Sequence, residues 1–294
     1  MNRDIKVLVC CHKEDNAIIN EGIYYPIQVG SALSSIDLGF ERDDNSIEGG
    51  GNISRYNNQY SELTALYWAW KEMPPVKYIG LVHYRRYFHP RIDESYIRKI
   101  LKNQKYDVIV GKPIVGKMCN GDELERYIGY EDYYIMLNEV LKQHPECASS
   151  LISYAKYSRE WIPCNMFISS RAWMLKYCIW LFPILESVRK SIKISSYTRQ
   201  QRSLGYMGEF LLGVYLIWSK SKVKKVDYYH IRGEEYVFVS KSYIRRYVFS
   251  CVWWDSIKRK IYKLIKKKYT FKTNPSIVNG LSADGIKIAN LINL

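Results

Sequence analysis

The sequence predicts an α/β domain with a mostly parallel central sheet flanked by helices, followed by a basic helical appendage. Three observations support this prediction. Short apolar runs, typical of buried strands, alternate with segments of helical periodicity between residues 5 and 218. Histidine and arginine side chains directly follow two of these apolar runs. Lysine and arginine are concentrated in a later segment whose apolar residues recur at helical spacing.

The expected elements alternate along the chain. Strand-like runs occupy residues 5–11, 78–82, 106–110 and 161–169. Helical spacing of apolar residues covers residues 61–73, 95–103, 122–145, 171–190 and 205–218. Residues 41–60 are rich in Gly, Asn and Asp, and we expect them to form a long loop. The succession of strand, helix, strand, helix and strand is typical of a largely parallel sheet.

The composition indicates a globular chain. Of 294 residues, 47% are hydrophobic and 25% are charged, which is enough apolar material for a substantial core. Seven cysteines stand at irregular spacing, so the sequence favours reduced thiols over a disulfide framework or a zinc site. The apolar runs are too short for a signal peptide or a membrane span, and we expect a cytoplasmic protein. The chain contains no P-loop, GxGxxG, GxSxG or HExxH motif.

Positive charge is concentrated near the C-terminal end. The net charge is +15, and residues 220–272 contain 16 Lys or Arg against four acids. We expect residues 1–225 to form the main domain and residues 226–294 a basic amphipathic region, peripheral on an anionic inner-membrane surface. Apolar residues and lysines between 247 and 265 fall on opposite faces of a helix. A helix packed on its own domain is the competing interpretation, and nucleic acid is disfavoured because no binding fold is recognisable.

Cationic residues at strand ends predict an anion-binding pocket. The stretch YIGLVHYRRYF, residues 78–88, begins like a buried strand and ends with His83, Arg85 and Arg86, and His12 follows the first strand. Ligands of open α/β sheets bind beyond the carboxyl ends of the strands. Guanidinium groups bind phosphate oxygens bidentately, and His83 would donate to a phosphate or a sugar hydroxyl. Strand alternation would place His83 and Arg85 on one face and Arg86 on the other.

Several acidic residues have a structural and a chemical interpretation. Glu62 or Asp107 would form a structural salt bridge with one of the arginines. Glu209, at the start of the helix expected at 205–218, is either a helix-capping acid, which is the commoner role, or a general base with a pKa raised by burial. Asp43 and Asp44 would hold a divalent cation only if their loop folded toward the pocket, and a solvated turn is favoured.

His230 has no strong sequence context. It follows a basic strand-like run, and it is either a site residue or, as is more common for a lone histidine, a surface residue. The sequence alone does not choose between these two interpretations.

Several longer phrases resemble a known family. They are IKVLVCCHK, YYPIQVGSAL, NNQYSELTALYWAWK, YIGLVHYRRYF and GYMGEFLLGVYL, in this order, over about residues 4–218. Together they resemble a bacterial family described as domain of unknown function 4422, which is similar to glycosyltransferases of capsule and O-antigen gene clusters. The resemblance implies a GT-A-like nucleotide-sugar transferase fold. It also implies a UDP-hexose donor, with galactose or galactofuranose as the sugar, and a growing or lipid-linked glycan as acceptor.

The resemblance also implies roles for individual residues. The donor-binding residues would be His12, Glu62, His83, Arg85 and Arg86, and Glu209 would be the catalytic base that activates the acceptor. The phrase His83-Tyr84-Arg85 stands where many GT-A enzymes have a metal-binding Asp-x-Asp, so fixed cations would stabilise the departing diphosphate. No residue is assigned as a metal ligand, and both a site without a cofactor and one with Mn²⁺ or Mg²⁺ stay open. The rival hypothesis is a non-catalytic module that binds RNA or anionic lipid through the basic C-terminal region.

Overall fold

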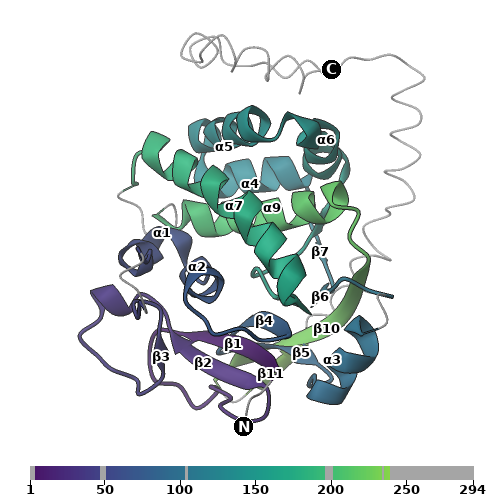
Figure 1. The fold of residues 1–294 in the computed structure, drawn as a ribbon. Helices are drawn as coiled ribbons and strands as arrows, with labels where there is room; N and C mark the ends of the chain where they lie inside the picture. The colour runs from purple at the N-terminus through teal and green to yellow at the C-terminus, as the bar shows by residue number, and fades with distance from the viewer. Residues whose placement is uncertain (1–3, 47–50, 103–104, 196–200, 234, 239–294) are drawn as a thin grey trace, which may run out of the picture.

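The computed structural model describes residues 4–46, 51–102, 105–195, 201–233 and 235–238 (Figure 1). The strands are β1 (Ile5–Cys11), β2 (Tyr24–Gln28), β3 (Glu41–Arg42), β4 (Tyr78–His83), β5 (Arg86–His89), β6 (Val108–Gly111), β7 (Ile114–Val115), β8 (Glu160–Trp161), β9 (Phe167–Ser170), β10 (Val223–Arg232) and β11 (Glu235–Phe238). The helices are α1 (Asn57–Tyr60), α2 (Leu63–Lys71), α3 (Glu94–Leu101), α4 (Asn120–Ile128), α5 (Tyr130–Gln143), α6 (Ala148–Tyr157), α7 (Arg171–Ser191) and α9 (Ser203–Trp218). Short 3₁₀ helices cover Ser31–Leu33, Ser54–Tyr56 and Pro145–Cys147.

The central sheet is mixed. In the part of the chain that the structure describes, nine strands form it in the order β11-β10-β6-β9-β4-β1-β2-β3, and β5 pairs with both β10 and β4. The pairs β1–β2, β1–β4, β2–β3 and β6–β10 are parallel. The pairs β4–β9, β6–β9, β4–β5, β5–β10 and β10–β11 are antiparallel. The α/β class predicted from the sequence is confirmed, but the expectation of a mostly parallel sheet is wrong.

Two connections introduce the antiparallel pairs. After β4 the chain turns back through Tyr84 and Arg85 into β5, so that His83 and Arg86 stand opposite each other. Much later in the chain, β9 enters between β4 and β6 in the antiparallel direction. A short apolar run indicates a buried strand but carries no information about which neighbour it pairs with or in which direction. The strand order therefore comes from contacts that are distant in sequence.

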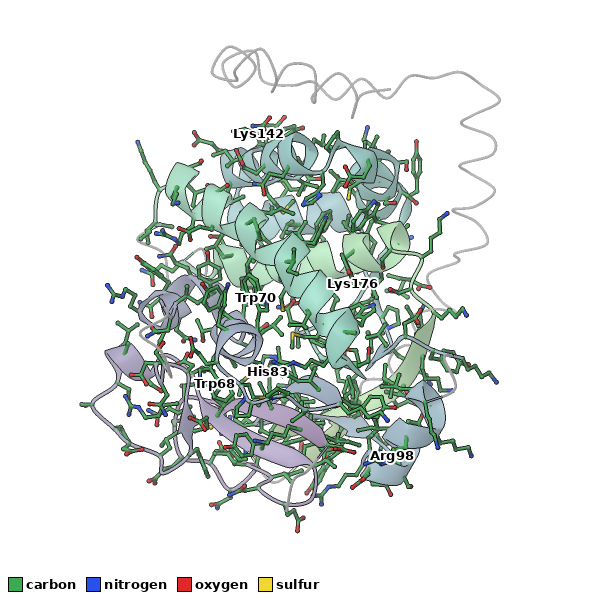
Figure 2. All side chains as sticks on the ribbon, viewed as in Figure 1. Trp68, Trp70, His83, Arg98, Lys142 and Lys176 are labelled. Carbon is green, nitrogen blue, oxygen red and sulfur yellow. The ribbon has the colours of Figure 1, made fainter. Side chains whose placement is uncertain are left out.

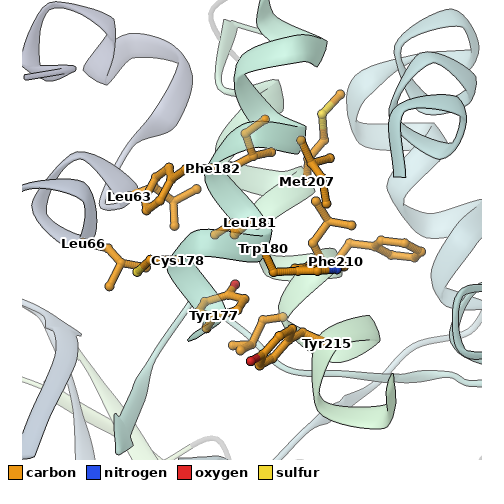
Figure 3. Packing of buried hydrophobic residues seen from close by; sticks show 14 of the residues in the cluster. Leu63, Leu66, Tyr177, Cys178, Trp180, Leu181, Phe182, Met207, Phe210 and Tyr215 are labelled. Carbon is orange, nitrogen blue, oxygen red and sulfur yellow. The ribbon is translucent and has the colours of Figure 1, made fainter. Parts of the chain in front are cut away.

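Both faces of the sheet are covered, which explains the continuous apolar runs of β1 and β4. On β1, Leu8 and Cys10 face the core that also contains α2, α7 and α9, whereas Val7 and Val9 face the core that contains α3. Figure 1 shows the larger helical layer stacked over one face of the sheet and α3 on the other side. Figure 3 shows side chains of α2, α7 and α9 packed together in the first of these cores.

Some expected boundaries differ from the observed ones. Residues 41–60 are not one long loop, because they contain β3, a 3₁₀ turn and α1. The helix expected at 122–145 is divided into α4 and α5, which meet at Gly129 with a φ of 93°. This left-handed backbone favours glycine and ends the first helix.

The domain boundary expected at residue 225 falls inside β10. Residues 223–226 of this strand pair with β6, and residues 227–230 pair with β5. The central sheet therefore continues past residue 225 as far as β11. The basic amphipathic helix expected within residues 247–265 lies outside the described residues. Among the residues that are described, no helix combines the length and the hydropathy that a membrane crossing needs.

A close contact between α9 and α6 gives a stability prediction. A Cβ on Gly213 would overlap the ring of Tyr154, which is 3% exposed and closely surrounded. We expect Gly213→Ala to lower the free energy of unfolding by about 1–3 kcal/mol, because overpacking forces buried groups apart. Urea unfolding measures this change. Gly51→Ala is the matched control, since a Cβ on Gly51 meets no atom within 4 Å. Equal unfolding free energies for the two variants would contradict the prediction.

Candidate active site

A cavity of about 470 Å³ lies beyond the carboxyl ends of β1 and β4. Its walls come from these strand ends, from β5 and β10, from α1 with the turn that follows it, and from the residues just before α9. Figure 2 labels His83 between the sheet and the helical layer, far from the outer surface of α3 that carries Arg98. The cavity therefore lies at the edge of the sheet where parallel strands end, as ligand sites of α/β proteins do.

The five residues predicted to bind a donor all line this cavity. They are His12, Glu62, His83, Arg85 and Arg86. The catalytic base expected from the sequence, Glu209, is not among the lining residues. The structure thus brings the five residues together from three separate segments, and their role in binding stays a prediction.

The two adjacent arginines project into the same cavity. The expected alternation of faces is wrong, because β4 ends at His83 and the chain turns before β5 begins at Arg86. Residues that stand directly opposite each other in an antiparallel pair project to the same face of the sheet. Arg85 lies in the turn itself and also lines the cavity. The hairpin therefore presents both guanidinium groups to one space.

The charge of Arg85 already has a partner. Its Nε donates to Oδ2 of Asp15 at 2.8 Å, and the two groups form an ion pair. The structural salt bridge considered in the sequence analysis thus exists, but with Asp15 instead of Glu62 or Asp107. Arg86 forms no ion pair with any of the described residues. Among the described residues, Arg86 is thus the arginine of this hairpin without an ion pair, and its role in binding an anion stays a prediction.

A second such cation, Arg202, comes from the residue before α9. Its Nε donates to Oγ of Ser61 at 3.0 Å, and it lines the cavity. Within the described ranges, it makes no ion pair with a carboxylate. Among the described residues, Arg86 and Arg202 are therefore the arginines of the cavity that form no ion pair.

The histidines of the cavity are neutral near pH 7. Burial, followed by the charge of Arg86, lowers the pKa of His83 to about 3 and that of His230 to about 4. Burial and neighbouring cations also lower the pKa of His12. These rings therefore act as hydrogen-bonding groups, and the positive charge comes from the arginines.

The tautomer of His83 follows from its surroundings. Nε2 of His83 lies 2.9 Å from the backbone carbonyl oxygen of Cys164. A carbonyl oxygen only accepts, so the neutral ring carries its proton on Nε2. The other nitrogen, Nδ1, is then an acceptor. The donor role expected for His83 therefore does not fit this tautomer. Its Nδ1 instead suits a sugar hydroxyl that donates to it, and not a phosphate.

Glu62 is the buried acid of the cavity, and it is only 5% exposed. Its Oε1 accepts a hydrogen bond from Nδ2 of Asn165 at 2.7 Å and lies 4.0 Å from Nε2 of His83. Burial raises the pKa of Glu62, against the opposing effects of the Asn165 hydrogen bond and of Arg202 and Arg86. Glu62 thus lines the cavity and also contacts Asn165, which lies behind the cavity wall.

Glu209 lies behind the cavity wall on α9. This helix begins at Ser203, so Glu209 is in its second turn and the helix-capping interpretation is wrong. Its Oε2 accepts a hydrogen bond from Nε1 of Trp161 at 2.8 Å, and the residue is half-buried. Burial, followed by the charge of Glu62, raises the pKa of Glu209 to about 7. An acid with this pKa is suited to accept a proton near neutral pH.

Two glycines allow α9 to approach the start of α2. A Cβ on Gly205 would lie 3.0 Å from Oγ of Ser61, and a Cβ on Gly208 would lie 2.5 Å from Cδ1 of Leu63. Glycines three positions apart lie on the same face of a helix. In the sequence GYMGE, the two glycines therefore allow the close helix contact, and Glu209 directly follows the second glycine.

Asp43 is a structural acid, and its interpretation as part of a solvated turn is wrong. It is 1% exposed. Its carboxylate accepts hydrogen bonds from the backbone N–H groups of Gly30 at 2.8 Å and Ser31 at 3.0 Å, and from the hydroxyl of Ser54 at 2.5 Å. The neighbouring Asp44 pairs with an arginine of β3. Within the described ranges, no group of three or more His, Cys, Asp or Glu is arranged to hold a metal ion.

Sequence reasoning missed several residues of the site. The cavity is also lined by Asn57, Asn58, Ser61, Tyr84, Gln201, Arg202 and His230. Asn165, which holds Glu62, was missed as well. His230, named above as either a site or a surface residue, lines the cavity, and its role as a site residue stays a prediction. The only sequence signal for Arg202 is that a basic, polar segment immediately precedes the apolar helix α9.

Comparisons with known proteins give the family of the chain and a solved structure with a similar fold. Among solved structures, the chain is similar to the WbbM bifunctional glycosyltransferase in its apo form, with 28% sequence identity and a TM-score of 0.69. The match covers 78% of this chain and 45% of that one, so this chain spans less than half the length of that enzyme. A comparison with curated proteins finds no match. A model of the family described as "Domain of unknown function (DUF4422)" matches residues 6–221, so the chain belongs to the DUF4422 family.

Proposed function

We propose that this protein is a GT-A-like glycosyltransferase that transfers a hexose, galactose or galactofuranose, from a UDP-sugar to a growing or lipid-linked glycan in capsule or O-antigen synthesis. The similarity to a bifunctional glycosyltransferase supports a transferase in general. The observation that carries the proposal is the cavity itself, in which Arg86 and Arg202 form no ion pair with the described residues. Two such cations suit a diphosphate, which is the anionic part of a nucleotide-sugar donor.

The chemistry proposed for the donor follows from the same groups. The volume of about 470 Å³ falls within the roughly 300–1,000 Å³ that small-molecule sites occupy. Arg86 and Arg202 would bind the diphosphate and stabilise the negative charge that develops on UDP as it leaves. Neutral His83 would accept a hydrogen bond from a hydroxyl of the sugar. Glu62 and His12 would complete the binding site.

The proposed reaction is a single displacement with inversion, and Glu209 is the proposed base. The acceptor hydroxyl loses its proton to Glu209, and its oxygen forms a bond with the anomeric carbon. The bond between that carbon and the diphosphate oxygen breaks, and its electron pair leaves with UDP. A base that serves the acceptor need not line the donor cavity. The pKa of about 7, raised by burial and by Glu62, supports this role.

The proposed location is the inner face of the plasma membrane. It rests on the basic, amphipathic pattern of residues 247–265, which suits an anionic lipid surface. Sedimentation of the full chain with vesicles tests it. Binding to phosphatidylglycerol vesicles but not to phosphatidylcholine vesicles at low salt is the expected result, and equal binding to both would contradict it.

The proposed function predicts that UDP stabilises the folded protein. A ligand that binds only the folded state raises stability by about 2.7 kcal/mol at 100 times its dissociation constant. We expect a thermal shift with UDP and with some UDP-hexoses, a smaller one with UMP, which lacks the second phosphate, and none with uridine. Sugar transfer or slow donor hydrolysis by the same preparation completes the test.

Two outcomes would reject the proposal. One is the absence of any shift with nucleotide sugars. The other is binding that responds only to RNA or anionic vesicles, as the rival non-catalytic module predicts. Repeating the UDP titration with EDTA and then with Mn²⁺ or Mg²⁺ shows whether the cations of the cavity suffice without a metal.

A further inference from the structure

The strongest unexplained feature near the site is the backbone at residues 164 and 165. Cys164 has a φ of 64° and Asn165 a φ of 48°, so two consecutive residues that are not glycine adopt the left-handed conformation. This region is disfavoured for residues with a Cβ and is kept only where the surroundings determine it strongly. Asn165 is also 1% exposed, and its Oδ1 has no hydrogen-bond partner.

This turn contacts three groups of the site. The carbonyl oxygen of Cys164 accepts from Nε2 of His83 at 2.9 Å, and Nδ2 of Asn165 donates to Oε1 of Glu62 at 2.7 Å. The backbone amide of Cys164 also favours the ionised form of Glu209, as its hydrogen bond lowers the pKa of that acid. Three side chains from three different elements are thus held by two adjacent residues.

The orientation of the Asn165 amide follows from its partners. Nδ2 lies 3.3 Å from the carbonyl oxygen of Gly205 as well as 2.7 Å from Glu62. A carbonyl oxygen only accepts, so the group that faces both partners is the NH₂ donor. Asn165 therefore donates to Glu62. A donor at this position stabilises the carboxylate form of Glu62.

We propose that Asn165 is a positioning residue of the reaction proposed above: its side chain fixes Glu62, and the left-handed turn at 164–165 sets Glu62, His83 and Glu209 in one hydrogen-bonded group. This inference rests on the proposed function. Its physical consequence is that the Asn165 hydrogen bond favours the ionised form of Glu62 against the effect of burial, and that negative charge on Glu62 raises the pKa of Glu209. Glu209 must therefore first lose its own proton before it can accept one from the acceptor hydroxyl.

The groups that act on the two carboxylates come from every element around them. Those that influence Glu209 are Glu62, Arg86, Tyr154, Trp161, Cys164 and Tyr228. Those that influence Glu62 are Cys10, His83, Arg86, Cys164, Asn165, Tyr177, Arg202 and Glu209. Asn165 is uncharged and donates directly to Glu62, so its replacement changes hydrogen bonding without changing the net charge.

The decisive variant is Asn165→Gly, because glycine adopts the left-handed backbone without strain while the buried amide, with its donor to Glu62, is removed. Without the donor, Glu62 binds a proton more readily, so its negative charge raises the pKa of Glu209 less. The acid limb of the pH profile is the range in which kcat/KM rises as Glu209 loses its proton. We expect this limb to move to lower pH by about one unit, because a neighbouring charge typically shifts a titration by this amount. Glu62→Gln should move the limb in the same direction. Trp161→Phe should move it to higher pH, because it removes a hydrogen bond to the ionised form of Glu209.

A control and a second readout separate this role from a merely structural one. Gln28→Ala removes another buried amide, which among the described residues bonds the backbone of Ile36 and Leu38, so it should lower stability without moving the limb. The titration of Glu209 is also followed directly by NMR of protein labelled at the glutamate carboxyl carbons, with the signal assigned by its loss in Glu209→Gln. This readout needs no turnover, so it tests the inference even if the proposed transferase activity is not found. An Asn165→Gly protein in which Glu209 titrates as in the unmodified protein, or at higher pH, would overturn the inference.

Discussion

Glu209→Gln is expected to lower the rate of sugar transfer by about 10²–10⁴-fold, which is the usual contribution of a positioned general base. Glutamine has the shape of glutamate but does not accept a proton at neutral pH. UDP affinity should change little, because Glu209 does not line the donor cavity. Initial rates of transfer, together with UDP binding by calorimetry, measure the two effects separately.

The pH dependence of the unmodified protein belongs to the same prediction. Glu209 must be ionised to act as a base, and burial and Glu62 raise its pKa to about 7. The rate should therefore rise as the pH increases through about 7. An ordinary exposed glutamate would place this rise near pH 4.3. A rise in rate near pH 7 would therefore indicate that Glu209 is the base, whereas a rise near pH 4.3 would indicate an exposed carboxylate.

A matched substitution controls for the general effects of removing a carboxylate. Glu94→Gln neutralises an acid in the first turn of α3, on the opposite side of the sheet from the helical layer that carries Glu209. Its transfer rate and pH profile should match those of the unmodified protein. If Glu209→Gln instead keeps a rate within a few-fold of normal, another group accepts the proton, and Glu62 is then the acid to test because it lines the cavity.

The residues of the site that the sequence identified are those with a local signal. His83, Arg85 and Arg86 follow an apolar strand directly, and a cation at the end of a buried strand needs a partner, either an anionic ligand or an acid such as the Asp15 that pairs with Arg85. His12 follows β1 in the same way, and parallel pairing of β1 with β4 brings the two strand ends together. One local rule, that parallel strands share an edge, was enough to predict this part of the cavity.

The remaining residues have no local signal, because their position depends on contacts distant in sequence. Asn165 reaches Glu62 across 103 positions, and Arg202 reaches Ser61 across 141. The antiparallel entry of β9 between β4 and β6 places the 164–165 turn beside His83, and no periodicity in the sequence reports this pairing. The same limit explains why the sheet was expected to be mostly parallel.

Arg86→Ala and Arg202→Ala are each expected to weaken UDP binding by about 10–100-fold. A hydrogen bond to a charged group contributes about 1.5–3 kcal/mol, and 1.4 kcal/mol corresponds to tenfold in affinity. Arg86→Lys should recover part of the loss, because lysine keeps the charge but not the bidentate geometry. Calorimetry at low and high salt measures these affinities. The matched control is Arg98→Ala, since Arg98 lies on the outer surface of α3 (Figure 2).

The ion pair of Arg85 provides the sharpest form of this prediction. Arg85 is held by Asp15, so Arg85→Ala should weaken UDP binding less than Arg86→Ala does, and Asp15→Asn should strengthen it. The second change releases a guanidinium group into the cavity and removes a negative charge beside it, and both effects favour a diphosphate. The gain should shrink as salt is added, because screening weakens exposed charges most. Weaker UDP binding by Asp15→Asn would contradict this prediction. It would mean that Asp15 holds Arg85 in the position from which Arg85, together with Arg86, binds the diphosphate.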